Sequence, residues 1–455
     1  MVTSENKFPV SFVLQMKSLL GDESENFFDS LQTEPPVSIR INPKKNFSSE
    51  GEKVSWCGNG RYLKERPVFT LDPLFHAGAY YVQEASSMFL EQIIKQLELD
   101  KSPIRALDLC AAPGGKSTHL LSLLHENSLL ISNEVIKSRI NVLKENIIKW
   151  GDVNCIVTNN DANDFDSMEN YFDLIVCDAP CSGEGLFRKD KDAIKHWSPK
   201  HVEFCSSRQK RIIADAWNTL KPGGVFVYCT CTYNEKENED VFKWASLKFE
   251  IRNSKFEINS PDGVSVSEKN GIKSYRFYPH KIKGEGFCIS VLRKGDKHES
   301  ATGKIKNEKT ISPSKNHLKI ILSWFQQPEH FEFIQHESAI FILHKWHLHD
   351  YFFLKRNLKI NYAGARIALI KGKNVQPAPE LAFSHHLNAA AFTHLSLSKA
   401  DALRYLKGAT DFTGDGKDGY YLMMYKNIPL GFSKKIAARF NNLFPKEWYI
   451  RMKVG

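Results

Sequence analysis

Long apolar runs are missing from this chain of 455 residues. No segment approaches the roughly 18 uninterrupted apolar residues that a membrane-spanning helix needs, which excludes a transmembrane protein. The amino-terminal segment, residues 1–9, also lacks the basic stretch and the apolar core of a secretory signal. We therefore expect a cytoplasmic protein that has no membrane partner.

Cysteines at paired spacing are missing as well. The nine cysteines are an odd number, and none of them shows the Cys-x-x-Cys or Cys/His spacing of a zinc site. We therefore expect reduced thiols and no bound metal. Cys57 lies in a polar, Gly-rich stretch that suggests no role for it. Five others lie in apolar runs or helical stretches and are expected in the core: Cys155, Cys177, Cys205, Cys229 and Cys288.

Phosphate-binding glycine patterns are also absent. Residues 106–116, ALDLCAAPGGK, read as a strand, a tight turn and the start of a helix. The turn contains only Gly114 and Gly115, so it matches neither the Gly-x-Gly-x-x-Gly of dinucleotide-binding folds nor the Gly-x-x-x-x-Gly-Lys of a phosphate loop. The two glycines still let the backbone approach a ligand closely. Because both phosphate-binding patterns are missing, we expect this ligand to have no phosphates.

Acidic residues close three further apolar strands. Glu134 follows Leu129–Asn133, Asp161 follows the strand that begins at Ile156, and Asp178 ends the strand that begins at Phe172. Ligands of open α/β sheets bind at the carboxyl ends of the strands, where a carboxylate can accept hydrogen bonds from ribose hydroxyls. The pattern predicts a nucleoside-like cofactor without phosphates, and S-adenosylmethionine is the candidate.

Two cysteines stand out from the rest. Cys181, in DAPCSGEG at 178–185, and Cys231, in YCTCT at 228–232, each follow an apolar run that reads as a core strand. A thiolate is a strong nucleophile when its site lowers the pKa of the thiol. The pair indicates covalent chemistry beside the cofactor.

These strings resemble motifs of the Sun-type RNA (cytosine-5) methyltransferases. DLCAAPGGK at 108–116 is similar to the cofactor loop of that family, and the strings at 178–185 and 230–239 are similar to its two cysteine motifs. RFYPHK at 276–281 with GEGF at 284–287 resembles the end of the catalytic domain, and SIRIN at 38–42 and HAGAYYVQEASSM at 76–88 resemble the amino-terminal part. GYYLMM at 419–424 and PLGFSK at 429–434 resemble the extra domain of the bacterial F-type enzymes that act on small-subunit ribosomal RNA.

The resemblance implies a role for each site residue. Cys231 attacks C6 of cytosine, Cys181 helps to release the product, and Asp178 contacts the base at N3. DNA cytosine methyltransferases place the attacking cysteine in the Pro-Cys string, so the reverse assignment of the two thiols stays open. The residues implied to bind the cofactor are Cys110, Ala111, Ala112, Pro113, Gly114, Gly115, Lys116, Glu134, Asp161 and Asp178.

The expected fold is α/β, with a Rossmann-like S-adenosylmethionine methyltransferase domain at 96–295. A small α+β domain at 1–95, which contacts RNA in the family, precedes it, and a polar linker at 296–314 follows. Residues 315–455 are expected to form a basic RNA-binding region of two lobes, the second of which, about 386–455, is PUA-like. Residues 301–455 contain 23 lysines and arginines against 11 aspartates and glutamates, a net charge of +12, whereas the whole chain has +10. This bias fits attraction to a phosphate backbone.

The expected function is methylation of cytosine C5 in RNA, with 16S ribosomal RNA or the small ribosomal subunit as the partner. The target base must be unpaired or flipped out, because a stacked cytosine does not present C6 to a thiolate. Two alternatives stay open: a transfer RNA substrate, and a ribosome-assembly factor that binds RNA without catalysis. We expect a monomer.

Overall fold

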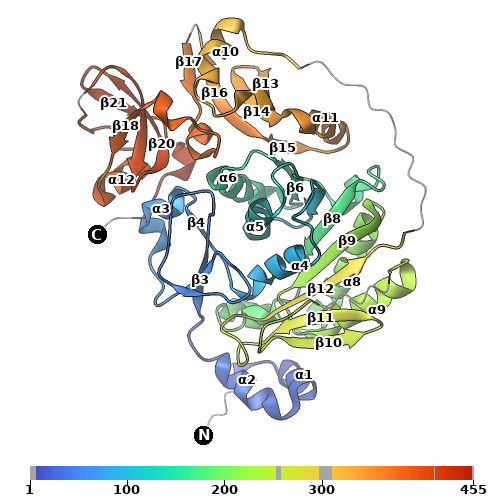
Figure 1. The fold of residues 1–455 in the computed structure, drawn as a ribbon. Coiled ribbons are helices and arrows are strands. Elements are labelled where there is room, and N and C mark those ends of the chain that lie inside the picture. The colour runs from blue at the N-terminus through green and yellow to red at the C-terminus, as the bar shows by residue number, and fades with distance from the viewer. Residues whose placement is uncertain (1–6, 253–257, 297–309, 373, 415, 453–455) are drawn as a thin grey trace.

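A sheet of nine strands forms the centre of the molecule within the described residues, 7–252, 258–296, 310–372, 374–414 and 416–452 of the computed structural model (Figure 1). The middle of the sheet is parallel, in the order β7-β6-β5-β8-β9. Its strands are β5 (Arg105–Asp108), β6 (Leu129–Asn133), β7 (Cys155–Thr158), β8 (Phe172–Asp178) and β9 (Leu220–Thr230). The chain order reverses between β5 and β8, and open α/β sheets bind their ligands at such a point.

Three antiparallel strands extend the sheet beyond β9. β12 (Phe287–Arg293) pairs antiparallel with β9. β11 (Ile272–Phe277) and β10 (Ser265–Lys269) continue this edge. The predicted α/β class is therefore confirmed.

Helices cover both faces of the central sheet because its strands alternate their buried side chains. In β8, Leu174 and Val176 belong to the core on one face, and Ile175 and Cys177 belong to the core on the other. The first face is covered by α4 (Leu90–Gln96), α5 (Gly115–Leu123) and α6 (Ile140–Trp150). The second face is covered by α8 (Pro199–Trp217), α9 (Glu239–Lys248) and α11 (Leu348–Asn357).

The amino-terminal part contains a small sheet in the order β2-β3-β1-β4. The strands are β1 (Val37–Ile41), β2 (Glu52–Lys53), β3 (Gly60–Leu63) and β4 (Tyr80–Val82), with α3 (Pro73–His76) before β4. Helices α1 (Val10–Leu20) and α2 (Ser24–Ser30), at the lower end of Figure 1, pack elsewhere. Their buried Phe12 and Phe27 share a core with Trp197, which follows α7 (Lys191–His196), and with Tyr233, which follows β9. The first helices are thus packed against the segments that follow α7 and β9.

The carboxyl-terminal region contains two further sheets, each of four described strands. The first has the order β13-β14-β16-β17 and follows α10 (Lys315–Leu322): β13 (Phe331–His336), β14 (Ala339–His344), β16 (Ala365–Lys371) and β17 (Asn374–Pro377). The second, orange-red in Figure 1, joins β18 (Thr393–Ser396), β19 (Gly419–Tyr425), β20 (Ile428–Ile436) and β21 (Arg439–Asn442), with α12 (Lys399–Leu406) packed beside them. Most of the predicted linker, at 297–309, lies outside the described residues.

One strand of this region joins the central sheet. β15 (Ile360–Ala363) leaves the first carboxyl-terminal lobe and pairs antiparallel with β7, with Ile360 opposite Thr158 and Ala363 opposite Ile156. Leu354 of α11 packs into the hydrophobic core on the second face of the central sheet. Backbone hydrogen bonds between β15 and β7 therefore connect the carboxyl-terminal region directly to the central sheet. None of the described helices has both the length and the apolar character that crossing a membrane requires.

Candidate active site

The two predicted thiols meet beyond the ends of neighbouring strands. Asp178, which ends β8, is opposite Cys229 in β9, so the chain segments that follow the two strands leave the sheet side by side. Cys181 and Cys231 are both half-buried, and their Sγ atoms are 3.1 Å apart. The backbone N–H of Gly185 donates to the carbonyl of Cys231 at 2.8 Å, which fastens the two segments together. We call residues 179–187 the Cys181 loop and residues 231–238 the Cys231 loop.

Close packing of backbone fixes this arrangement. A Cβ on Gly185 would lie 2.3 Å from the carbonyl oxygen of Gly286, so a larger residue there would force the Cys181 loop to move. Gly183 has φ +75°, a conformation that glycine adopts without strain. The Cys181 loop is therefore tightly packed at Gly185.

The environment of Cys181 favours its protonated form. The hydrogen bond with the Cys231 sulfur, burial and the nearby negative charge of Glu237 together raise the pKa of the Cys181 thiol well above its usual value. Cys181 is thus suited to remain a thiol beside Cys231 while the site is at rest.

A lysine and an aspartate face each other beside the thiols. The Nζ of Lys116, in the first turn of α5, is 2.7 Å from the Oδ2 of Asp178. Burial opposes the charge on Lys116, but the Asp178 carboxylate and further acidic groups nearby, Asp108 among them, together outweigh burial and raise the pKa of Lys116 above its usual value. The same ammonium lies 5.1 Å from the centre of the Phe287 ring. The site therefore contains a buried cation that the sequence motif assigned only to the cofactor.

The predicted cofactor loop lines a cavity of about 180 Å³ between β5, α5 and the amino-terminal part. Gly114 has φ +113° and lets the chain turn directly into α5. The predicted residues that line the cavity are Cys110, Ala111, Ala112, Pro113, Gly115, Lys116 and Asp178. The buried Asp108 precedes them, where burial raises its pKa to about 7 and Ser117 donates to its carboxyl group at 2.6 Å.

The other two predicted acids differ in their surroundings. Glu134 is buried beside the cofactor loop and accepts from the backbone N–H of Ala112 at 3.3 Å and of Ile136 at 2.9 Å. Asp161 is partly exposed and is held by the guanidinium of Arg211 in α8, at 3.1 and 3.3 Å. The structure therefore brings Glu134 to the loop but directs the carboxylate of Asp161 toward α8. Neither acid is among the lining residues of the 180 Å³ cavity.

Sequence reasoning missed the contribution of the amino-terminal part to this site. The opposite wall of the cavity consists of Tyr81, Val82, Gln83, Glu84 and Ser87. Arg40 is buried over the Trp150 ring at 4.4 Å and donates to Gln83 and to Thr118 of α5, so it fastens this wall to the helix of the cofactor loop. The strings at 38–42 and 76–88 were the signal that could have identified these residues.

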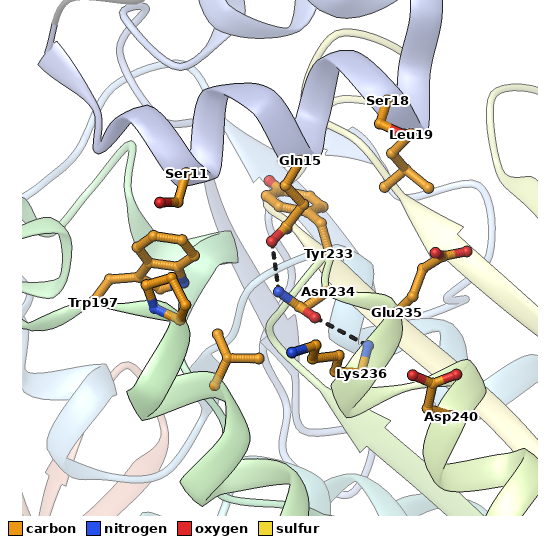
Figure 2. A pocket seen from close by; sticks show the side chains of 12 residues that line it. Ser11, Gln15, Ser18, Leu19, Trp197, Tyr233, Asn234, Glu235, Lys236 and Asp240 are labelled. Atoms are coloured by element: carbon orange, nitrogen blue, oxygen red, sulfur yellow. Dashed lines mark hydrogen bonds between the residues drawn. The ribbon is translucent and has the colours of Figure 1, made fainter.

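A second cavity, of about 640 Å³, lies between α1 and the Cys231 loop. Figure 2 shows Gln15 of α1 pointing across it toward Asn234, whose side-chain amide donates to the Oε1 of Gln15 at 2.6 Å. Beneath this pair lies the buried Glu184, which accepts from Gln15, Trp197 and Asn234 at 3.0–3.1 Å. Helix α1 thus contacts both cysteine loops.

A buried cluster of three potential metal ligands lies in another part of the described structure. Cys57, Glu91 and His119 place their ligand atoms within 4.8 Å of one another. The Nε2 of His119 is 3.3 Å from Glu91 and 3.8 Å from Cys57, and burial lowers the pKa of His119 to about 4 and raises that of Cys57 to about 12. The cluster is explained by hydrogen bonds among neutral and paired groups. The absence of a bound metal stays a prediction.

Comparison with protein families gives matches over most of the chain. Residues 96–293 match the family model described as 16S rRNA methyltransferase RsmB/F. Residues 8–85 match the N-terminal domain of 16S rRNA methyltransferase RsmF, and residues 392–450 match the methyltransferase RsmF PUA domain. The predicted PUA-like fold in the carboxyl-terminal region is therefore confirmed.

Individual relatives agree with these matches. The chain is 28% identical to the ribosomal RNA small subunit methyltransferase F of Pectobacterium atrosepticum, over 96% of this chain and 95% of the relative. A solved methyltransferase homolog protein from Pyrococcus horikoshii is 25% identical with a TM-score of 0.53, over 65% of this chain and 99% of its own. NSun6 from Pyrococcus horikoshii with SFG, at 22% identity and a TM-score of 0.52 over 64% of this chain and 99% of its own, has the same fold. The predicted Rossmann-like methyltransferase fold is confirmed.

Proposed function

Because the chain belongs to the RsmB/F family of 16S rRNA methyltransferases and is thus an RNA methyltransferase, we propose that it methylates C5 of a cytosine in 16S rRNA. The observation that carries this proposal is the contact between Cys181 and Cys231, 3.1 Å apart beyond the carboxyl ends of β8 and β9. Cytosine C5 is a weak nucleophile, and a thiolate that adds to C6 activates it. A second sulfur beside the first is what the release step needs.

The cofactor loop fits S-adenosylmethionine. Among the residues that line its cavity, all of them described, Lys116 is the only cation, and Asp178 already pairs with it, which argues against a phosphate. We assign to Glu134, which is buried beside Ala112 of this loop, the contact with the ribose hydroxyls. SFG, found with a relative of the same fold, is an analogue of this cofactor. When bound, S-adenosylmethionine supplies the electrophilic methyl group.

In the first half of the reaction the Cys231 sulfur forms a bond to C6, and the electron pair of the C5–C6 double bond becomes available at C5. Negative charge develops on the ring at N3, and we assign to Asp178, in its protonated form, the hydrogen bond or proton that N3 receives. The buried ammonium of Lys116, 2.7 Å from Asp178, offsets part of this charge. The methyl group then bonds to C5.

In the second half the C5 proton leaves, the C6–S bond breaks and the Cys231 thiolate is released. Once the Cys231 sulfur is bonded to C6 it is a neutral thioether, which accepts a hydrogen bond only weakly and no longer carries a negative charge that would hold the Cys181 proton. The main cause of the raised pKa of Cys181 then disappears, and its sulfur becomes able to assist proton removal. The raised pKa of the Cys181 thiol is thus consistent with a role in product release. We therefore assign the attack on C6 to Cys231.

The carboxyl-terminal region is proposed to bind the RNA. Its PUA domain presents Lys434, Lys435 and Arg439 on β20 and β21, and Lys434 lies 5.5 Å from the ring of Tyr420. This arrangement of cations and an aromatic ring suits phosphates and unpaired bases. We propose that the protein acts as a monomer in the cytoplasm, where ribosomal subunits are assembled.

Trapping the covalent intermediate tests this function. Purified full-length protein is incubated with S-adenosylmethionine and either 16S rRNA, 30S subunits or transfer RNA, and adducts are separated on a denaturing gel. Cys181→Ala is expected to accumulate a protein–RNA adduct, while Cys231→Ala forms none. Cys205→Ala, which changes a thiol of α8 outside the two loops, serves as the control and should behave like the wild type.

Each other outcome has a defined meaning. An adduct with Cys231→Ala alone would reverse the two roles. Methylation of transfer RNA with 16S rRNA untouched, read by bisulfite sequencing, would replace the substrate. A wild-type protein that binds these RNAs but methylates none of them would favour the assembly factor.

A further inference from the structure

Two buried glutamates that take no part in the proposed chemistry link the two cysteine loops. Glu237, in the Cys231 loop, and Glu184, in the Cys181 loop, each have no solvent-exposed surface. Uncompensated burial of a carboxylate is costly, so such groups are retained where several donors surround them. We infer that Glu237 and Glu184 are positioning residues that hold the Cys181 and Cys231 thiols in contact. This inference rests on the proposed function.

Glu237 receives donors from both loops. One carboxylate oxygen accepts from the backbone N–H of Ser182 at 2.8 Å and from Gln209 of α8 at 3.1 Å. The other accepts from the hydroxyl of Ser182 and from that of Thr232 at 3.1 Å. Ser182 directly follows Cys181, and Thr232 directly follows Cys231. A single carboxylate therefore connects the residues next to both thiols.

Glu184 makes the reciprocal connection from the other loop. It accepts from the backbone N–H of Tyr233 at 3.1 Å and from the side chain of Asn234 at 3.1 Å, both in the Cys231 loop. Gln15 of α1 and Trp197 complete its shell at 3.0 Å. Figure 2 shows Gln15 and Asn234 meeting, and both side chains donate to Glu184. Helix α1 thus contacts Glu184 of the Cys181 loop and Asn234 of the Cys231 loop through the side chain of Gln15.

The hydroxyl partners of Glu237 allow a decisive substitution. In Glu237→Gln the amide oxygen can still accept from Ser182 N–H and Gln209, and the amide nitrogen can donate to the hydroxyl oxygens of Ser182 and Thr232, which also accept. A positioning role therefore survives in Gln and is lost in Ala. A role in proton transfer would be lost in both.

Cross-linking of the two thiols measures their positions without RNA. Diamide oxidises Cys181 and Cys231 to a disulfide: the S–S bond forms, and two protons and two electrons pass to the diazene, which becomes a hydrazine. The rate is followed in full-length protein by mapping the linked peptides with mass spectrometry. We expect Glu237→Ala to slow this rate about tenfold or more, and Glu237→Gln to keep it within about twofold of wild type, as orientation effects of 1 Å suggest.

Methyl transfer is measured on the same variants. Glu237→Ala is expected to lower kcat by about 10- to 100-fold with the KM for S-adenosylmethionine unchanged, because the cofactor loop is not part of the connection. Glu237→Gln should restore most of kcat. Glu235→Ala removes an exposed glutamate from the same turn and serves as the matched control. If Glu237→Ala does not fold, Ser182→Ala removes only the hydroxyl donor and should show a smaller effect in the same direction.

The outcomes separate this inference from the proposed function. Unchanged cross-linking and kcat in Glu237→Ala would overturn the positioning role, as would a Glu237→Gln variant that cross-links normally but has lost methyl transfer. If the wild type cross-links rapidly and Glu237→Ala does not, the positioning role holds. If the same wild type methylates no RNA, the proposed function is refuted independently of that role.

Discussion

Glu237→Gln should change how the stability of the protein depends on pH. Burial raises the pKa of Glu237 to about 7, against an ordinary value of 4.5 in the unfolded chain. Between these two values the folded protein retains a proton that the unfolded chain has lost. The free energy of unfolding therefore falls as the pH rises from 4.5 to 7 and is constant, in this contribution, above 7.

The size of the effect follows from the difference in pKa. A shift of this size corresponds to about 3 kcal/mol, of which about 2.5 kcal/mol falls between pH 5 and pH 8. Glutamine does not titrate, so the free energy of unfolding of Glu237→Gln should rise relative to wild type by that amount over this range. The raised pKa of Asp108, about 7, affects both proteins equally and cancels in the comparison.

Thermal unfolding at pH 5 and pH 8 is a suitable assay. With an unfolding entropy of about 1 kcal/mol/K for a chain of this length, the Tm difference between variant and wild type should change by about 2.5 °C, and by more if the catalytic domain unfolds separately. Glu235→Gln, an exposed neighbour, is the control and should show no change with pH. A Tm difference between Glu237→Gln and wild type that is the same at both pH values would refute this account of the buried carboxyl group.

Three further predictions concern the site and its walls. Asp178→Asn leaves Lys116 buried without its counter-ion, so methyl transfer should fall at least 100-fold while calorimetry still detects S-adenosylmethionine; full activity would contradict the role of Asp178. Gly185→Ala places a Cβ 2.3 Å from the carbonyl oxygen of Gly286 and should displace the Cys181 loop, so combining it with Cys181→Ala should abolish the trapped adduct on the denaturing gel. An adduct that persists in the double variant would show that the loop tolerates the extra methyl group. Arg40→Met removes the donors to Gln83 and Thr118, so Tm should drop by several degrees and the KM for S-adenosylmethionine should rise; an unchanged KM would show that this wall does not support the cofactor loop.

The parts of the site predicted correctly were those that local patterns encode. Apolar runs predicted the strands that end near Asp178 and Cys231, and because neighbouring parallel strands end at the same edge, the two thiols that follow them lie side by side. The Gly-Gly turn predicted the loop at Gly114 and the start of α5. These features depend on the residues within one strand and the turn that follows it.

The parts that were missed depend on pairs of residues far apart in the sequence. Gln15 and Glu184 are separated by 169 positions, and the pairing of Ile360 with Thr158 crosses what composition suggested was a domain boundary. No periodicity of α1 or β15 indicates these partners. Asp161 shows a related limit, because the pattern placed it at a strand end but gave no indication of Arg211, 50 positions later.

The pairing of β15 with β7 has a consequence for the kind of RNA that the protein accepts. A strand of the first carboxyl-terminal lobe is hydrogen-bonded into the edge of the catalytic sheet, and α11 is packed on the same side. That lobe cannot swing freely, as it would on a flexible tether, so it stands at a fixed distance from the thiols. Under the proposed function, a folded RNA that reaches this lobe and the thiols at a matching separation should therefore be methylated faster than a short oligonucleotide with the same local sequence.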